Sequence, residues 1–304
     1  MASTVGSGET TIVLTRQGTD LISTTLLAGR TDIGKIRLDN QDQFLVADLN
    51  RSMTIHSSSL PVEDETQLYS NMAGQLLVVC DGISGAPAGR VASQIGVGTV
   101  ARYVLNAMPW FLSLNHDHDD DQEEELLAAL LEVESAVEDE AAANPEFEGM
   151  GTTLTMAYIV WPRLYVVNIG DSRCYLLRGG GLEQLTHDQT VAQGLIERGT
   201  LTSDQAVGSP LAHVLVSSIG QGLSYFHPDV YKTELEDSDR ILICTDGLTN
   251  LVDDVRIAEL LGAADSPETA CETLIDEAND LGGHDNITVA VAFCHPPKTK
   301  YPRV

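Results

Sequence analysis

Residues 76–89 read LLVVCDGISGAPAG, an apolar run that ends on an acid and passes into a loop of glycine, alanine and proline. The run has the length and the β-branched content of a buried strand. Asp81 and Gly82 follow it directly, and Asp-Gly is a common turn-forming pair. The stretch therefore predicts a strand that delivers a carboxylate into a flexible loop.

Short apolar runs alternate with turn signals from about residue 22 onward, which predicts a fold rich in antiparallel sheet. Two hairpins are indicated, one turning around Trp161-Pro162-Arg163 and one at Gly179-Gly180-Gly181. We expect an α+β sandwich of four layers, αββα, in which two antiparallel sheets pack face to face between helices.

Two longer helices are predicted, at residues 88–108 and 122–143. The second follows an acidic run, NHDHDDDQEEE at 115–125, which we interpret as a solvated loop and first helical turn because carboxylates are favoured at a helix N-terminus. His116 and His118 in this run offer an alternative interpretation as a transition-metal site.

The segment at residues 188–222 is predicted to be a helical insertion and a candidate flap. Thr202 and Gln205 have the spacing of a capping box, and Gly199 fits a helix end just before them. We predict one domain over residues 21–294, with peripheral segments at 1–20 and 295–304.

The charge and composition exclude several classes of protein. The formal charge of -28 disfavours nucleic acid as a partner, because such binding depends on Lys and Arg. No apolar run approaches the roughly 18 residues of a membrane span, so we expect a cytoplasmic protein without a membrane partner. We also expect a monomer. Five cysteines without a C-x-x-C pair predict reduced, buried thiols. A phosphate-handling site in so acidic a chain would need local positive charge from metal ions or an arginine.

Five aspartates lie at the ends of predicted strands. Three follow strands and two precede them: Asp81, Asp171, Asp246, Asp42 and Asp285. Since strand ends and strand starts lie side by side in antiparallel sheets, all five can meet at one rim. Such a cluster needs cations to offset its repulsion, and oxygen ligands favour the hard ions Mg²⁺ or Mn²⁺. Paired hard ions can generate a hydroxide from water at neutral pH, which is the two-metal route to phosphoester hydrolysis.

These blocks together resemble the metal-dependent protein phosphatases, the type 2C serine/threonine phosphatases, in their bacterial form. The resemblance spans about residues 31–292 and rests on seven blocks in order: TDIGKIRLDNQDQF, VVCDGISG, GMGTTLTMAYI, VVNIGDSRCYLL, LTHDQTVAQGLIERGTLTSDQA, ILICTDGLTNLV and GGHDNITVAVA. It implies hydrolysis of phosphoserine or phosphothreonine in proteins that serine/threonine kinases phosphorylate.

The resemblance also implies a role for each site residue. Asp81 would bridge two Mn²⁺ or Mg²⁺ ions, with the Gly82 carbonyl as a further ligand. Asp246 and Asp285 would bind one ion, Asp42 would act on the other through water, and Asp171 would help to hold a third, weaker metal. Arg37 would receive the substrate phosphate, because a guanidinium matches phosphate with paired hydrogen bonds.

The chain departs from the family pattern at two positions. Gln41 stands where the family has an acid beside the metal-linked aspartate, which removes one negative charge. Ala86 stands where relatives carry a histidine, so no side-chain acid is expected at that position. These changes support an alternative hypothesis, a pseudophosphatase that binds phosphoproteins with weak or no turnover. Hydrolysis of a small phosphoester by the same metals is a third hypothesis.

Three other phosphate or hydrolase motifs fit less well. GRTDIGKI at 29–36 nearly matches a phosphate-binding P-loop, but Ile36 stands where the motif requires a hydroxyl. The cysteine phosphatase pattern C-x5-R fails at every cysteine, and the elbow G-x-S-x-G fails after Gly85.

Overall fold

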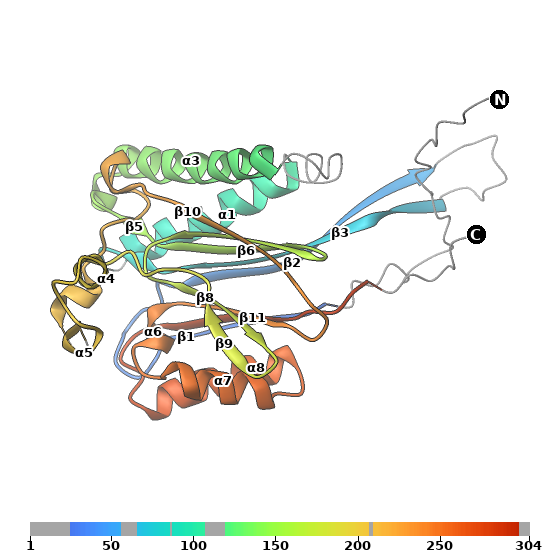
Figure 1. Ribbon diagram of the computed structural model, residues 1–304. Coiled ribbons are helices and arrows are strands. Elements are labelled where there is room, and N and C mark those ends of the chain that lie inside the picture. The colour runs from blue at the N-terminus through green and yellow to red at the C-terminus, as the bar shows by residue number, and fades with distance from the viewer. Residues whose placement is uncertain (1–24, 56–65, 86, 107–118, 207–208, 298–304) are drawn as a thin grey trace, which may run out of the picture.

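The computed structural model describes residues 25–55, 66–85, 87–106, 119–206 and 209–297 (Figure 1). Two antiparallel sheets of five strands each pack face to face, and helices cover both outer faces. The predicted αββα sandwich is therefore confirmed.

The first sheet has the strand order β10-β7-β6-β3-β2. Its strands are β10 (Asp229–Glu234), β7 (Arg163–Ile169), β6 (Leu154–Val160), β3 (Thr66–Cys80) and β2 (Gln43–Ile55). The predicted hairpin at Trp161-Pro162-Arg163 joins β6 to β7, and these strands pair from Leu154↔Ile169 to Val160↔Arg163.

The second sheet has the order β1-β12-β11-β8-β9. Its strands are β1 (Leu26–Asp32), β12 (Ile287–Phe293), β11 (Arg240–Cys244), β8 (Arg173–Arg178) and β9 (Gly181–Gln184). The glycine-rich hairpin joins β8 to β9, as predicted. A short ribbon of β4 (Gly82–Ile83) and β5 (Gly151–Thr152) stands apart from both sheets.

The run LLVV of β3 is apolar throughout because both of its faces are buried. Leu77 and Val79 point between the two sheets, where they pack with Ile243 and Ala290. Leu76 and Val78 point the other way, toward the helices that cover the first sheet. A strand that is buried on both faces loses the usual apolar and polar alternation.

Helices form the outer layers (Figure 1). α1 (Ala88–Asn106) and α3 (Asp119–Ala143) cover the first sheet, while α7 (Asp254–Ala263) and α8 (Pro267–Asp280) cover the second. The structure begins α3 three residues before the predicted start at 122, since the acidic run favours the first turn of a helix. Residues 107–118, which include His116 and His118, lie outside the described residues.

The segment at 188–222 is helical. It contains α4 (Val191–Glu197), α5 (Ser203–Ala206) and the 3-10 helix η2 (Pro210–His213). The capping box forms as predicted, because the Gln205 backbone N–H donates to Thr202 Oγ1 at 3.3 Å and the Thr202 N–H donates to Gln205 Oε1 at 3.0 Å. Three further short helices are η1 (Pro145–Phe147), η3 (Leu223–Tyr225) and α6 (Asp246–Thr249).

The P-loop hypothesis is wrong, because its first glycine lies inside a strand. Gly29 pairs with Ala290 in the middle of β1. A Cβ at this position would lie 2.5 Å from the Phe44 ring, so Gly29 allows the two sheets to approach closely. Its role is therefore in packing.

The cysteines are free and buried, as predicted. Burial raises the pKa of Cys244 and Cys271 to about 12, so these thiols carry no charge at neutral pH. Within the described part of the chain, no helix combines the length and the apolar character that crossing a bilayer requires.

Truncating Leu77 tests the packing between the sheets. Leu77→Ala should lower the free energy of unfolding by about 2–5 kcal/mol, since the side chain is fully buried and its loss leaves a cavity. Urea unfolding measures the change. Val255→Ala on the exposed face of α7 is the control, with an expected change within about 0.5 kcal/mol. Equal effects would contradict a tightly packed interface.

Candidate metal centre

A pocket of ≈ 250 Å³ lies where the ends of both sheets meet. Four of the predicted aspartates line it, together with Arg37 and Gly82: Asp81, Asp171, Asp246 and Asp285. Asp81 follows β3 directly, Asp171 follows β7, Asp246 begins α6 after β11, and Asp285 precedes β12. The expected convergence of strand ends is thus present for these four.

Asp42 lies behind the pocket and does not line it. Its side chain is only 1% exposed, and its Oδ2 accepts hydrogen bonds from Thr245 Oγ1 at 2.9 Å and Thr288 Oγ1 at 2.7 Å. Its Oδ1 is buried without a hydrogen-bond partner. Burial raises the pKa of Asp42 to about 7, although the two threonine hydroxyls oppose this shift. The two threonines therefore fix the Asp42 carboxyl group, and its Oδ1 has no hydrogen-bond partner.

Hydrogen bonds to both the N–H and the carbonyl of Asp81 fix its backbone. Its N–H donates to Thr153 Oγ1 at 3.0 Å, and its carbonyl accepts from Thr153 N and Thr152 Oγ1, each at 2.9 Å. The neighbouring Gly82 pairs with Thr152 in the β4–β5 ribbon. These bonds fix where the carboxylate leaves β3.

The first turn of α1 packs so closely against residue 82 that only glycine fits there. A Cβ on Gly82 would lie 2.3 Å from the Gly89 carbonyl oxygen, so any larger residue would displace the helix. Gly89 is equally constrained, because its Cβ would lie 2.3 Å from Gln41 Oε1. The two glycines bring the loop at Gln41, the strand end and the helix together.

The electrostatics of the pocket favour cations. Burial raises the pKa values of Asp81 and Asp171 well above the ordinary value, and the neighbouring carboxylates raise them further. Three buried side-chain oxygens around the site lack a hydrogen-bond partner: Gln41 Oε1, Asp42 Oδ1 and Asp246 Oδ1. Uncompensated buried oxygens cost free energy that a bound cation would remove. An all-oxygen set fits Mg²⁺ or Mn²⁺.

Two side chains contact the carboxylates from the rim of the pocket. Arg37 Nη2 donates to Asp285 Oδ2 at 2.7 Å, and His213 Nδ1 lies 3.9 Å from Asp246 Oδ2. The described residues contain no ready-made group of three or more His, Cys, Asp and Glu side chains that could enclose a metal ion. Ligation would therefore require the carboxylates to move closer together.

Two site residues were missed in the sequence. His213 reaches the pocket from η2, and no local motif indicates this. Asn286 anchors the loop that carries Arg37. Its Oδ1 accepts from the Gln41 N–H at 2.9 Å, and its Nδ2 donates to the Ile33 and Asp39 carbonyls at 3.0 Å. Its position directly after Asp285 was the feature of the sequence that could have indicated a role at the site.

Glu134 on α3 anchors the end of the helical segment near the pocket. Its side chain is 2% exposed, and its Oε2 accepts from the Gly220 N–H at 2.7 Å. The adjacent Ile219 exchanges backbone hydrogen bonds with Thr152, the residue that also bonds the Asp81 carbonyl. Burial raises the pKa of Glu134. A buried carboxylate thus links α3 to the β4–β5 ribbon.

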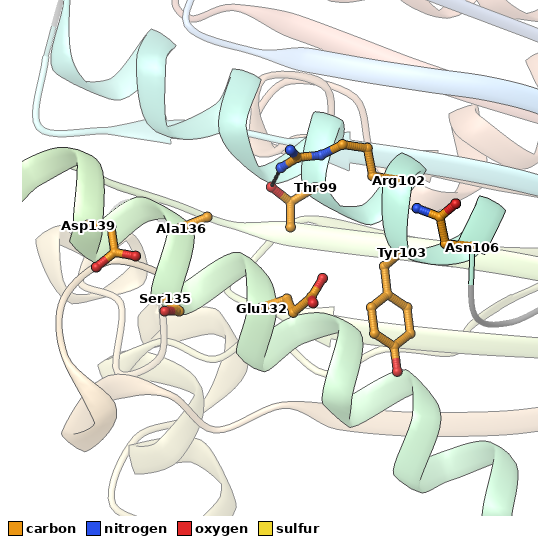
Figure 2. Close-up of a pocket in the computed structure, with 8 residues that line it drawn as sticks. All are labelled: Thr99, Arg102, Tyr103, Asn106, Glu132, Ser135, Ala136 and Asp139. Atoms are coloured by element: carbon orange, nitrogen blue, oxygen red, sulfur yellow. Dashed lines mark hydrogen bonds between the residues drawn. The ribbon is translucent and has the colours of Figure 1, made fainter.

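A second hollow, of ≈ 520 Å³, lies between α1 and α3 (Figure 2). It is larger than the carboxylate pocket, but its charged groups are of both signs: Arg102, Glu132 and Asp139. Arg102 Nη2 donates to Thr99 Oγ1 at 3.0 Å within this hollow. The concentration of carboxylates distinguishes the smaller pocket as the candidate site.

Comparison with known proteins agrees with this fold. The family model described as protein phosphatase 2C matches residues 54–274. The chain is 36% identical to the serine/threonine protein phosphatase PstP of Mycobacterium tuberculosis over 234 residues, which cover 75% of this chain and 42% of PstP. It is 31% identical to the protein phosphatase PhpP of Streptococcus pneumoniae over 263 residues, covering 86% of this chain and 94% of PhpP.

Solved structures give the same result. The crystal structure of PstP superposes with a TM-score of 0.71 at 31% identity, covering 90% of this chain and 99% of the other. The catalytic domain of PstP in complex with two manganese ions gives a TM-score of 0.69, also at 31% identity, over 90% of this chain and 100% of that domain. The chain belongs to the protein phosphatase 2C family. It spans less than half of the length of PstP.

Replacing Glu134 tests its buried charge. Because the folded pKa is raised, the carboxyl stabilises the fold fully below its unfolded pKa of about 4.5, and this contribution is lost as the pH rises through the folded value. Glu134→Gln removes the charge and keeps an acceptor for Gly220. We expect the variant to match the native chain at acidic pH and to exceed its stability at neutral pH.

Urea unfolding in metal-free buffer, below pH 4.5 and at neutral pH, measures this difference. Glu132→Gln, an exposed carboxylate on the same helix, controls for the loss of one charge. A stability difference between Glu134→Gln and the native chain that does not change with pH would contradict the raised pKa.

Proposed function

We propose that this chain is a metal-dependent serine/threonine protein phosphatase that hydrolyses phosphoserine and phosphothreonine with metal-activated water. The observation that carries the proposal is the pocket at the sheet ends, where Asp81, Asp171, Asp246 and Asp285 face one cavity beside Arg37. The family membership and the names of the relatives support the same conclusion.

The proposed ligand set is the one that the family resemblance implies. Asp81 would hold two ions, with the Gly82 carbonyl as a further ligand, while Asp246 and Asp285 would bind one of them. Asp42 would act on the other through water, since its free Oδ1 lies behind the pocket. Asp171 would help to hold a third, weaker ion.

Arg37 would receive the substrate phosphate. Its side chain is half exposed, and the loop that carries it is anchored by Asn286. Its contact with Asp285 must be exchanged for the phosphate when Asp285 turns toward a metal. A guanidinium then offers two parallel N–H donors to two phosphate oxygens, which orients the phosphorus toward the carboxylates.

Bound divalent ions would lower the pKa of water and neutralise charge on the phosphoryl oxygens. The chain's own residues would position these groups. Thr245 and Thr288 hold Asp42, and Thr152 and Thr153 hold the backbone of Asp81. Ala86 lies outside the described residues, so the expectation that no side-chain acid acts from that position stays a prediction.

The two manganese ions of the PstP catalytic domain support two Mn²⁺ or Mg²⁺ ions here. Proteins phosphorylated by serine/threonine kinases are the proposed substrates, which would place the enzyme in signalling. A cytoplasmic location and a monomeric state stay predictions from the sequence.

The alternative of a pseudophosphatase is less well supported. It would be favoured by loss of an aspartate or of Arg37, and this chain retains all of them. Gln41 is the remaining departure at the described site, and its unpartnered Oε1 still provides an acceptor near the pocket.

Removal of the central carboxylates should abolish turnover. We expect Mn²⁺-dependent phosphate release from a phosphothreonine peptide, and a loss of at least about 100-fold in kcat for Asp81→Ala and Asp246→Asn. Calorimetry should show weaker Mn²⁺ binding by both variants. A native chain that binds Mn²⁺ without turnover would establish the pseudophosphatase instead. Variants that stay as active as the native chain would refute the site.

Truncation of Arg37 should chiefly weaken substrate binding. Arg37→Ala should lower kcat/KM by roughly 10–100-fold, the value of a charge-assisted hydrogen-bonded pair, mostly through KM. Arg37→Lys keeps the charge and loses the paired geometry, so it should recover only part of the activity. Steady-state kinetics with the same peptide measure both changes, and an unchanged KM in Arg37→Ala would contradict the role.

A further inference from the structure

Exposed apolar side chains are concentrated in two segments that also contribute residues to the pocket. Of the twelve large apolar side chains exposed among the described residues, seven belong to two segments, residues 33–38 and 211–225. We call these seven the apolar rim: Ile33, Ile36, Leu38, Leu211, Val214, Val216 and Tyr225. A single exposed apolar residue is ordinary, but a group of them marks an interaction surface.

Both segments of the apolar rim contain residues that line the pocket. Ile36 and Leu38 stand next to Arg37, which lines the pocket. Val214 stands between His213 and Leu215, which line the same pocket. Exposed apolar side chains are therefore adjacent in the chain to Arg37, His213 and Leu215, which line the site where a phosphate would bind.

The loop at 33–38 does not need these side chains to keep its shape. Its backbone is fixed by Lys35 N donating to the Gly283 carbonyl at 2.7 Å and by Gly34 N donating to Asp32 Oδ1 at 2.8 Å. Gly34 has φ 77°, and a Cβ there would lie 2.2 Å from the Asp285 carbonyl oxygen. The loop is thus tightly seated while Leu38 is 100% exposed and Ile36 is 64% exposed. Folding gives no reason for apolar residues at these two positions.

A phosphoprotein segment is the occupant that fits both the pocket and the apolar rim. An extended chain advances about 3.3 Å per residue, so residues within about three positions of a phosphorylated one reach about 10 Å from the pocket. The carboxylates and the net charge of -28 repel acidic flanking residues. Apolar flanking side chains would gain burial against the apolar rim without this repulsion.

We propose that the apolar rim selects phosphoprotein segments in which bulky apolar residues flank the phosphoserine or phosphothreonine. This inference rests on the proposed phosphatase function. It assigns Ile36 and Leu38 on one side, and Val214 on the other, as determinants of substrate specificity.

The test compares four phosphothreonine peptides with Mn²⁺, identical except for the two residues on each side of the phosphothreonine: leucine, serine, glutamate or lysine. p-Nitrophenyl phosphate serves as a probe without flanking residues. The expected kcat/KM for the leucine peptide is about 10-fold above that of the serine peptide, which corresponds to partial burial of one or two side chains. The glutamate peptide should be the poorest substrate.

Substitutions in the apolar rim test which residues produce the preference for the leucine peptide. In the double variant Ile36→Ser with Leu38→Ser, the preference for leucine over serine should fall toward unity, while p-nitrophenyl phosphate turnover changes much less. Val214→Ser tests the other side of the pocket separately. Val255→Ser, an exposed apolar residue on α7, is the matched control and should keep the full preference. Thermal unfolding of each variant checks that the fold is retained.

The outcomes separate the two proposals. No turnover of any peptide contradicts the phosphatase function itself. Equal turnover of the leucine and serine peptides, or a preference for the lysine peptide, overturns the inference and leaves the function intact. A leucine preference that persists in both the double variant and Val214→Ser shows that other residues select the substrate, and this also overturns it.

Discussion

Repulsion among carboxylates is the constraint on which the functional end of this protein depends. Asp81 and Asp171 lie in surroundings that raise their pKa values, and Asp42 lies behind them with one unpartnered oxygen. A fold tolerates such a group only if rigid elements hold the carboxylates and cations can enter. The strands supply the rigidity, because each pocket aspartate leaves or precedes a strand buried in the sandwich. Binding of hard metal ions would offset the repulsion within the cluster.

The hydrogen bonds around the pocket show how the two sheets cooperate. Thr288 lies in β12 and Thr245 directly follows β11, both in the second sheet. Their hydroxyls donate hydrogen bonds to Asp42, which directly precedes β2 of the first sheet. Asn286 joins the loop of Arg37 to the start of β12. Glu134 joins α3 to the segment that ends beside β5. Displacement of any of these groups would move a carboxylate, so we expect the stability and the chemistry of this end to be coupled.

The surface around the pocket suggests how the enzyme meets its substrate. Arg37 provides positive charge at the pocket of an acidic chain, and it lies between Ile36 and Leu38, two residues with exposed apolar side chains. We propose that this combination would bind a phosphate through charge and the residues beside it through burial. Net charge then acts against acidic partners, which sharpens the selection.

The sequence by itself determined the class of fold and most of the residues of the candidate site. Apolar runs, turn residues and capping residues act locally, so they predicted the hairpins, the capping box at Thr202 and the aspartates at strand ends. Only the tertiary structure decided that Asp42 lies behind the pocket, that Gly82 makes room for α1, and that His213 and Glu134 approach the site. These contacts join residues far apart in the chain, and local patterns carry no information about which distant groups will meet.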